Sequence, residues 1–177
     1  MYYCRFGEDQ ILDRLTGYLP VGFYIDVGAN SPDIDSVTKC FYERGWNGIN
    51  IEPVLNHHPA LLQNRPRDIN LAIACGEKSG YVELFVENYL TMGLSTAKKE
   101  YAKQEWVSRQ VPVDTLANIC KSFAQNRVIN FLKIDVEGFE ANVIKGMDWE
   151  NIVREYYVLS QLNLIRLLAH TMNGNRY

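Results

Sequence analysis

Three acidic side chains each stand at the end of an apolar run that is typical of a buried strand: Asp26, Glu52 and Asp135. In open α/β sheets, ligands bind at the carboxyl ends of the strands, where the strand order reverses. A carboxylate placed like Glu52 accepts two hydrogen bonds from a ribose diol, and Asp26 can accept hydrogen bonds from a ligand ammonium or through water. The spacing therefore predicts a site for a nucleoside with a positively charged tail.

The turn after Asp26 distinguishes between two classes of nucleotide site. A dinucleotide site favours the GxGxxG pattern, because several glycines admit the pyrophosphate to a helix N-terminus. Here the turn Gly28-Ala-Asn30 holds one glycine, and Asp26 would repel phosphate. The Walker pattern is also absent from the sequence. S-adenosylmethionine fits better, because it combines ribose hydroxyls, an amino-acid head and a sulfonium cation.

The elements that must position these acids alternate between strands and helices. We predict strands over residues 22–27, 47–53, 69–75, 81–86 and 128–135, and helices over residues 31–45, 54–64, 115–123 and 139–145. The polar segment 91–110 is predicted to be a surface loop with one helix. A strand, a helix and a strand within about 30 residues form a βαβ unit with parallel strands. The pattern predicts one α/β domain with a mostly parallel sheet.

Composition excludes several other classes of protein. The 177 residues are 47% hydrophobic and 22% charged, near globular averages, so we expect a single domain over residues 1–177. The net charge of −3 offers no basic field for nucleic acid or anionic lipid. No apolar run approaches the ~20 residues of a membrane span, and the N-terminus lacks a signal-peptide pattern. Four widely spaced cysteines predict reduced, buried thiols and a cytoplasmic location.

Five segments carry a resemblance to a known family: Phe23-Tyr-Ile-Asp-Val-Gly-Ala-Asn30, Ile49-Asn-Ile-Glu-Pro53, Gly93-Leu-Ser-Thr96, Val113-Asp-Thr-Leu116 and Phe131-Leu-Lys-Ile-Asp-Val-Glu-Gly-Phe-Glu140. The first alone is a weak signal, since many class I methyltransferases carry something similar, but the combination is specific. Together they resemble the FkbM family of S-adenosylmethionine-dependent methyltransferases, many of which act on sugar hydroxyls. The resemblance covers roughly residues 4–150. It implies a Rossmann-like class I methyltransferase fold with helices on both faces of the sheet.

The resemblance also implies which residues hold S-adenosylmethionine. The turn of the first strand matches the family's first cofactor motif, and Glu52 matches its ribose-binding acid. The third strand, near residues 68–71, lies where such folds usually contact adenine. The candidate cofactor-binding residues are Asp26, Gly28, Asn30, Glu52 and Asn70.

Asp135 and Glu137 match the acidic motif beside the methyl-transfer site and are the candidate catalytic residues. Lys133, Asp135 and Glu137 share one face if the strand stays regular that far. Either acid can serve as the general base that takes the acceptor's hydroxyl proton. Alternatively, the pair holds a divalent cation that lowers the pKa of that hydroxyl. Direct acid–base or orienting roles rank above metal binding, so no metal ligand is assigned.

Structural roles compete for the same acids. Asp26 can cap the helix that follows it, and Glu52 can be an ordinary solvated acid at a strand end. Asp135 and Glu137 can cap the helix that starts near Gly138, where negative charge is favourable. The sequence leaves these alternatives open.

Beyond about Val153 the chain departs from the family, and the segment 154–177 is atypical. Tyr156–Leu159 can add a strand, and three leucines at helical spacing (Leu164, Leu167 and Leu168) predict an amphipathic helix. We therefore expect a sheet that is truncated at its C-terminal strands, with residues 128–135 left as an edge.

A frameshift is one hypothesis for this departure. Residues 172–177, read two nucleotides later with permitted codons, can give Glu-Trp-Glu-Gln-Ile, which resembles the family's C-terminal region.

The sequence thus predicts a methyltransferase that uses S-adenosylmethionine to methylate a hydroxyl, on a sugar of a glycan or on a small-molecule secondary metabolite. The alternative is a truncated pseudoenzyme that binds the cofactor without turnover. A nicotinamide oxidoreductase is disfavoured by the missing glycine fingerprint. Neither the acceptor nor the oligomeric state follows from the sequence.

Overall fold

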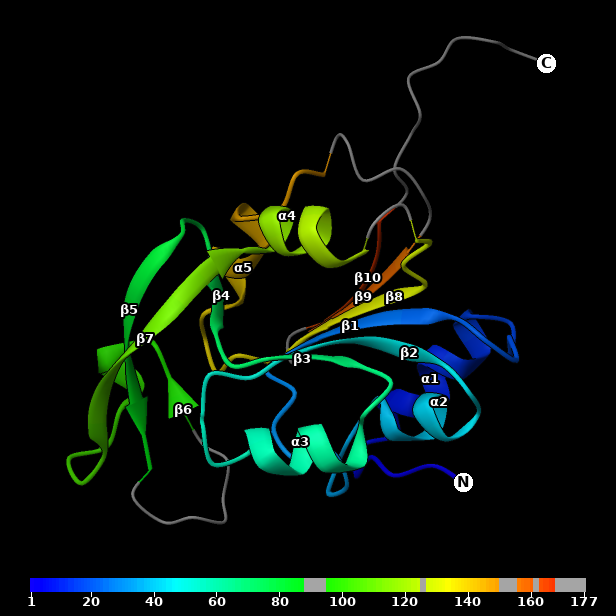
Figure 1. Cartoon of the computed structure of the whole chain (residues 1–177), viewed down its shortest axis with the longest axis horizontal. Helices are drawn as coiled ribbons and strands as arrows, with labels where there is room; N and C mark the ends of the chain where they lie inside the picture. Colours follow the sequence, from blue (N-terminus) through cyan, green and yellow to red (C-terminus); the bar gives the residue numbers. More distant parts are fainter. Residues whose placement is uncertain (88–94, 125–126, 150–155, 161–162, 168–177) are drawn as a thin grey trace, which may run out of the picture.

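The computed structural model describes residues 1–87, 95–124, 127–149, 156–160 and 163–167, the last two ranges by their backbone alone. Its larger sheet has the strand order β10-β9-β8-β1-β2-β3 (Figure 1). These strands are β1 (Phe23–Val27), β2 (Asn47–Ile51), β3 (Ile69–Leu71), β8 (Phe131–Ile134), β9 (Tyr156–Ser160) and β10 (Asn163–Leu167). All neighbours pair in parallel except β9 and β10. The predicted α/β architecture with a mostly parallel sheet is confirmed.

The chain changes direction across the sheet at β1. It runs outward from β1 through β2 to β3, and it later returns to the other side of β1 as β8. The carboxyl ends of β1 and β8 therefore form the switch point at which α/β sheets bind ligands.

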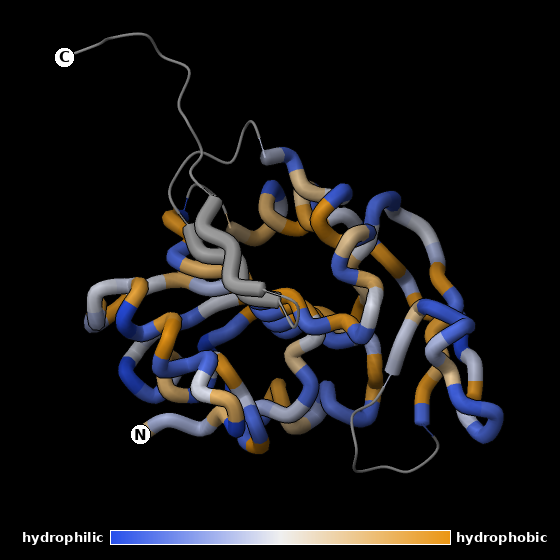
Figure 2. Tube along the Cα trace, turned by 180° about the vertical axis from the view of Figure 1, so that it is seen from behind, coloured by the Kyte–Doolittle hydropathy of each residue, from blue (hydrophilic) through white to orange (hydrophobic). Residues whose placement is uncertain are grey.

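Helices cover both faces of this sheet. On one face, α1 (Glu8–Leu15) and α2 (Lys39–Glu43) pack through Leu12 and Phe41 against Tyr24 and Phe131. On the other face, α4 (Leu116–Ile119) and α5 (Glu140–Lys145) pack against the apolar β1 and β8 side chains Phe23, Ile25, Val27, Leu132 and Ile134. In Figure 2 the apolar segments run along these strands and the helices beside them. None of the described helices has the length and apolar character to cross a membrane.

The other helical segments are short. The helix α3 (His58–Asn64) begins later than the predicted start at residue 54, with Pro59 in its first turn. Thr115 caps α4 by accepting a hydrogen bond from the backbone N–H of Asn118, and the π-helical η2 (Cys120–Ala124) continues it. A 3₁₀ turn, η1 (Lys99–Tyr101), is the one helical turn described within the predicted loop 91–110.

A second sheet, which the sequence did not predict, stands beside one end of the larger sheet (Figure 1). Its order is β4-β7-β5-β6, formed by β4 (Ala74–Gly76), β5 (Gly80–Val86), β6 (Ser95–Thr96) and β7 (Val107–Thr115). The predicted single strand over 69–75 is therefore wrong, because the run is divided between two sheets. The polar residues 107–110 form a strand because they pair with β5 along their whole length.

The helix predicted from Ser31 to Gly45 begins only at Lys39. Asp35 has a left-handed φ of 55°, which no α-helix accommodates. In addition, the carbonyl group of Pro32 accepts a hydrogen bond from the guanidinium of Arg65, and the carbonyl of Thr38 accepts one from Arg65 as well as the helical N–H of Tyr42. A side chain about 30 residues away thus overrides the local helix signal.

The expectations for the C-terminal segment are corrected in two respects. β8 is not an edge, since β9 pairs with it in parallel. The predicted helix at Leu164 and Leu167 is instead the strand β10, antiparallel to β9. The segment is a strand because it pairs with β9, and the spacing of the leucines in the sequence does not reveal that pairing. Leu168 and the residues of the frameshift hypothesis, 172–177, lie outside the described residues.

Trp46 provides a test of this core. Its side chain is fully buried, with ring centroids 5.0 Å from Phe41 and 5.9 Å from Phe131, and its indole N–H donates to the carbonyl of Leu19. Trp46→Ala should lower the free energy of unfolding by about 3–5 kcal/mol, measured by urea denaturation, because it leaves a cavity. The control Tyr81→Ala, at a side chain that is 76% exposed, should change it by less than about 0.5 kcal/mol. Equal losses would contradict this packing.

Candidate functional site

A cavity of about 170 Å³ opens at the carboxyl ends of β1, β2 and β8. Five of the predicted site residues line it: Gly28, Asn30, Glu52, Asp135 and Glu137. The sheet switch point, which brings these strand ends together, explains how residues more than 100 positions apart meet. Asp26 and Asn70 are not among the lining residues.

Asp26 lies behind the cavity and is paired with Lys133. The two residues are register partners on β1 and β8, and Lys133 Nζ lies 3.0 Å from Asp26 Oδ1. The other oxygen of Asp26 accepts a hydrogen bond from Thr38 Oγ1 at 3.1 Å. Asp26 is 1% exposed and does not line the cavity, whereas its partner Lys133 does. The structure thus gives Asp26 a charge partner within the protein rather than the predicted ligand ammonium.

Lys133 connects three acceptors at the switch point. Besides Asp26, its ammonium donates to the carbonyl oxygen of Gly28 at 2.6 Å and lies 3.7 Å from Asp135 Oδ2. Burial by itself lowers the pKa of Lys133, but the carboxylates of Asp26, Asp135 and Glu52 outweigh this and hold the pKa above its ordinary value. Lys133 is therefore a buried cation that the surrounding acids keep charged.

Glu52 is held by the backbone of two neighbouring turns. Its Oε2 accepts the N–H of Asn30 and its Oε1 accepts the N–H of Val54, both at 2.8 Å. Burial raises the pKa of Glu52, and the two N–H donors counteract this only in part. The side chain is 4% exposed, so the alternative of an ordinary solvated acid is wrong. Each oxygen keeps one further lone pair for a ligand donor.

Gly28 is a glycine because of the neighbouring strand. It has a left-handed φ of 78°, and a Cβ there would lie 1.9 Å from the carbonyl oxygen of Asp135. The close approach at Gly28 is therefore between two protein backbones, at the end of β1 and the end of β8. Asn30 also has a positive φ, of 50°, which an asparagine tolerates.

Asp135 and Glu137 follow β8 but do not share a regular strand face with Lys133. The strand ends at Ile134, and Glu137 has a left-handed φ of 50°. The turn is held by Thr96, whose hydroxyl donates to the carbonyl oxygen of Glu137 at 2.8 Å. The expected common face is thus absent, although the turn still brings both acids to the cavity wall.

The N-terminus of α5 is not capped in the way that the structural alternative proposed. Its N-cap residue, Phe139, makes no side-chain cap hydrogen bond. Glu140 Oε1 instead accepts the backbone N–H groups of Val136 and Gly138. Glu140 therefore takes the stabilising role that was considered for Asp135 and Glu137.

Asn70 lies in β3 and uses its side-chain amide within the protein. The amide oxygen accepts from Asn50 at 2.8 Å, and the amide nitrogen donates to the carbonyl of Arg65 at 3.1 Å. These contacts place Asn70 in a network that joins β2, β3 and the end of α3.

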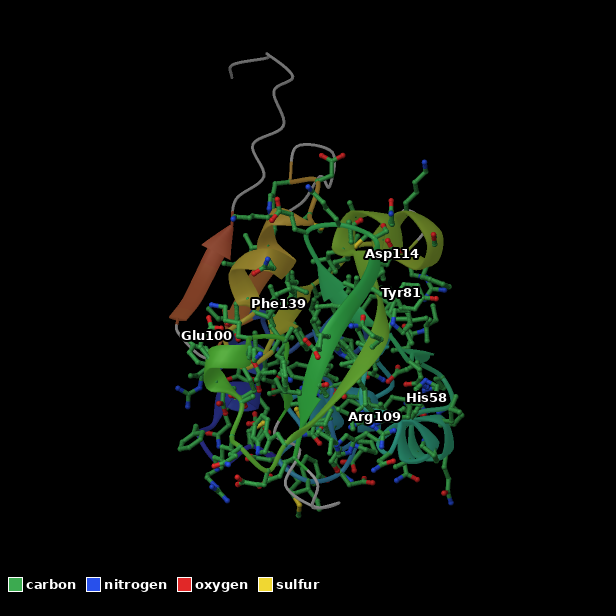
Figure 3. All side chains as sticks on the ribbon, turned by 90° about the vertical axis from the view of Figure 1, so that its left-hand side faces the viewer. His58, Tyr81, Glu100, Arg109, Asp114 and Phe139 are labelled. Atoms are coloured by element: carbon green, nitrogen blue, oxygen red, sulfur yellow. The ribbon has the colours of Figure 1, made fainter. Side chains whose placement is uncertain are left out.

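Two parts of the site were missed by sequence reasoning. One is the pairing of Lys133 with Asp26, although a lysine inside a buried strand is itself a signal, because lysine is rarely buried without a charge partner. The other is the wall formed by the second sheet, through Leu84, Ser95 and Thr96. Near this wall, η1, which carries Glu100, lies beside the start of α5 at Phe139 (Figure 3). Its Tyr101 ring packs against Gly138.

A divalent cation gains no support from this arrangement. Among the described side chains, no group of three or more His, Cys, Asp or Glu residues is placed to hold a metal ion. The positive charge next to Asp135 in this structure is the ammonium of Lys133.

The ion pair behind the cavity can be tested by a double-mutant cycle. Lys133→Met should lower the free energy of unfolding by about 3–5 kcal/mol in urea denaturation, because it leaves the Asp26 carboxylate buried without its partner. The double variant Asp26→Asn/Lys133→Met should recover most of this loss. Additive losses from the two single variants would show that the two charges do not depend on each other.

One of three comparisons with known proteins gave a match. A family model described as the methyltransferase FkbM domain matches residues 26–163. The match begins at Asp26 and includes Glu52, Asp135 and Glu137. It ends at the first residue of β10, beyond the expected limit near residue 150. Searches of curated proteins and of solved structures each found no match. Because the family model covers most of the chain, this protein belongs to the FkbM methyltransferase family.

Proposed function

We propose that this chain transfers the methyl group of S-adenosylmethionine to a hydroxyl oxygen, on a sugar of a glycan or on a small-molecule secondary metabolite. The single observation that carries the proposal is Glu52, a buried carboxylate at the strand switch point. Both of its oxygens are oriented by backbone N–H groups, and it lines the cavity. A carboxylate in this place, with lone pairs remaining, suits the two hydroxyls of a ribose.

The cavity also offers a place for the positive charge of the ligand. Asp135 Oδ1 is buried and has no hydrogen-bond partner within the described structure. An unsatisfied buried carboxylate oxygen is unfavourable in the unliganded protein. A ligand ammonium or sulfonium near Asp135 would remove this cost. The residues present therefore fit S-adenosylmethionine at both ends of the molecule.

When bound, S-adenosylmethionine supplies a methyl group activated by its sulfonium charge. The protein has to hold the acceptor oxygen in line with that methyl group, and such orientation supplies most of the rate. In this proposal Asp135 meets the positive charge, and Glu137, at the turn beside it, takes the proton of the acceptor hydroxyl. The Thr96 hydroxyl holds the carbonyl of Glu137 and so fixes the turn that presents this base.

The ribose assignment is tested by calorimetry with S-adenosylmethionine and its demethylated product. Glu52→Ala should weaken binding by about 1–3 kcal/mol, because charge-assisted hydrogen bonds to the ribose are lost. Ribose hydroxyls bind the ionised carboxylate, so binding to the wild type should also weaken as the pH falls through the raised pKa of Glu52. This decline should begin above the ordinary value of 4.5. The variant should lack this pH dependence. Unchanged affinity in the variant, or tighter binding of NAD by the wild type, would refute the assignment.

The proton-transfer step is tested by a methyl-transfer screen of sugar and small-molecule acceptors with labelled cofactor. Glu137→Gln should lower kcat by about 10²–10⁴-fold, the contribution of a general base, while affinity for the demethylated product stays unchanged. A chelator should leave wild-type transfer undiminished. Loss of activity with the chelator would establish the metal alternative. Cofactor binding by the wild type without transfer to any acceptor would favour the pseudoenzyme.

A further inference from the structure

One wall of the cavity is a loop without regular structure, residues 31–38. Ile34, Asp35, Ser36 and Val37 from this loop all line the cavity. No helix supports the loop internally, and Asp35 holds a left-handed conformation. Within the loop, Ser31 Oγ accepts the backbone N–H groups of Asp33 and Ile34, and the remaining shape of the loop depends on contacts with other parts of the chain.

The guanidinium of Arg65 provides buried contacts to this loop, in addition to the core packing of Val37 and the hydrogen bond from Thr38 to Asp26. Arg65 is 2% exposed, and it reaches back from the end of α3 to three acceptors in the loop. It donates to the carbonyl of Pro32, to Ser36 Oγ at 3.1 Å and to the carbonyl of Thr38 at 3.4 Å. The ring of Tyr42 lies 4.8 Å from the guanidinium. The planar, multi-donor geometry of arginine allows one side chain to hold several carbonyl groups at once.

The exposed side of the loop has its own contacts. Asp33 accepts hydrogen bonds from Lys39 and Asn64, and Asp35 Oδ1 accepts the backbone N–H of Arg5. Of these contacts, Lys39–Asp33 is an ion pair near the surface, and such ion pairs contribute little to stability. The buried guanidinium is therefore the stronger constraint on the part of the loop that faces the cavity.

The same guanidinium is connected to the ion pair behind the cavity. It holds the carbonyl of Thr38, and the hydroxyl of Thr38 donates to Asp26. We infer that Arg65 is a positioning residue, which fixes residues 32–38 in the conformation that receives S-adenosylmethionine. This inference rests on the proposed function, since it assumes that S-adenosylmethionine binds in this cavity.

The chain offers a matched control two residues further on. The guanidinium of Arg67 also lies over the ring of Tyr42, at 3.8 Å. It donates to the carbonyl of Tyr42, in α2, rather than to residues 32–38. A lysine at either position keeps the charge and loses the multi-donor geometry. Arg67→Lys therefore reports what such a change does near Tyr42 without releasing the loop.

The experiment measures two properties of the wild type, Arg65→Lys and Arg67→Lys. Calorimetry gives the Kd of the demethylated product of S-adenosylmethionine, and hydrogen exchange gives the protection of the amides of residues 33–38 without ligand. If the loop of Arg65→Lys adopts the binding-competent conformation about one-tenth of the time, the Kd of the demethylated product rises about tenfold. Its amides should exchange faster, and Arg67→Lys should match the wild type in both properties. In a transfer assay, Arg65→Lys should raise KM for S-adenosylmethionine more than it lowers kcat.

The outcomes separate this inference from the proposed function. A wild type that does not bind the demethylated product refutes the proposed function and the inference with it. A wild type that binds, with Arg65→Lys equal to Arg67→Lys in Kd and exchange, refutes the inference alone. If Arg65→Lys does not fold, Ser36→Ala removes one acceptor of the guanidinium instead. It should show the same changes on a smaller scale, and wild-type values for both properties would overturn the inference.

Discussion

The ion pair between Asp26 and Lys133 is the interaction on which the site depends. It joins β1 and β8, the two strands between which the chain reverses its direction across the sheet. Two buried charges are costly unless their remaining hydrogen-bonding capacity is satisfied. Here Thr38 donates to Asp26 Oδ2 and the carbonyl of Gly28 accepts from the ammonium, while Asp26 Oδ1 has the ion-pair contact with Lys133 as its partner. The pair therefore fixes the register of the switch point and holds the first turn of the cavity as well.

Close contact between backbones reinforces this junction. The backbone of Gly28 lies against the carbonyl of Asp135, so the ends of β1 and β8 approach more closely than any side chain at residue 28 would allow. Glu52 joins the next pair of elements by accepting N–H groups from the turn after β1 and from the residues after β2. Each acid at the switch point thus already contacts backbone N–H groups or a charged side chain of the protein. Only part of its hydrogen-bonding capacity remains for a ligand.

The expectations that failed lie mostly around the cavity. The segment expected to start a helix at Ser31 is a cavity wall held by Arg65, and the run 69–75 leaves the larger sheet to enter the second sheet. Local sequence signals fail in such places because a functional site imposes conformations that local preference alone would not choose. In contrast, the strands predicted over 22–27 and 47–53 and the helix predicted over 139–145 form close to their predicted bounds, although each has one end at the cavity.

The sequence by itself determined the α/β class, the parallel core strands and the positions of the acids at strand ends. These features depend on local apolar patterns and on short motifs, which are visible in any single segment. Only the tertiary structure decided that Asp26 pairs with Lys133, that Glu140 takes the N–H groups before α5, and that the second sheet closes the cavity. It also decided that β9 pairs with β8, so that β8 is not an edge of the sheet. The reason is that these contacts join residues that are distant in sequence or compete for the same partner. Which partner prevails depends on burial and geometry that no local pattern contains.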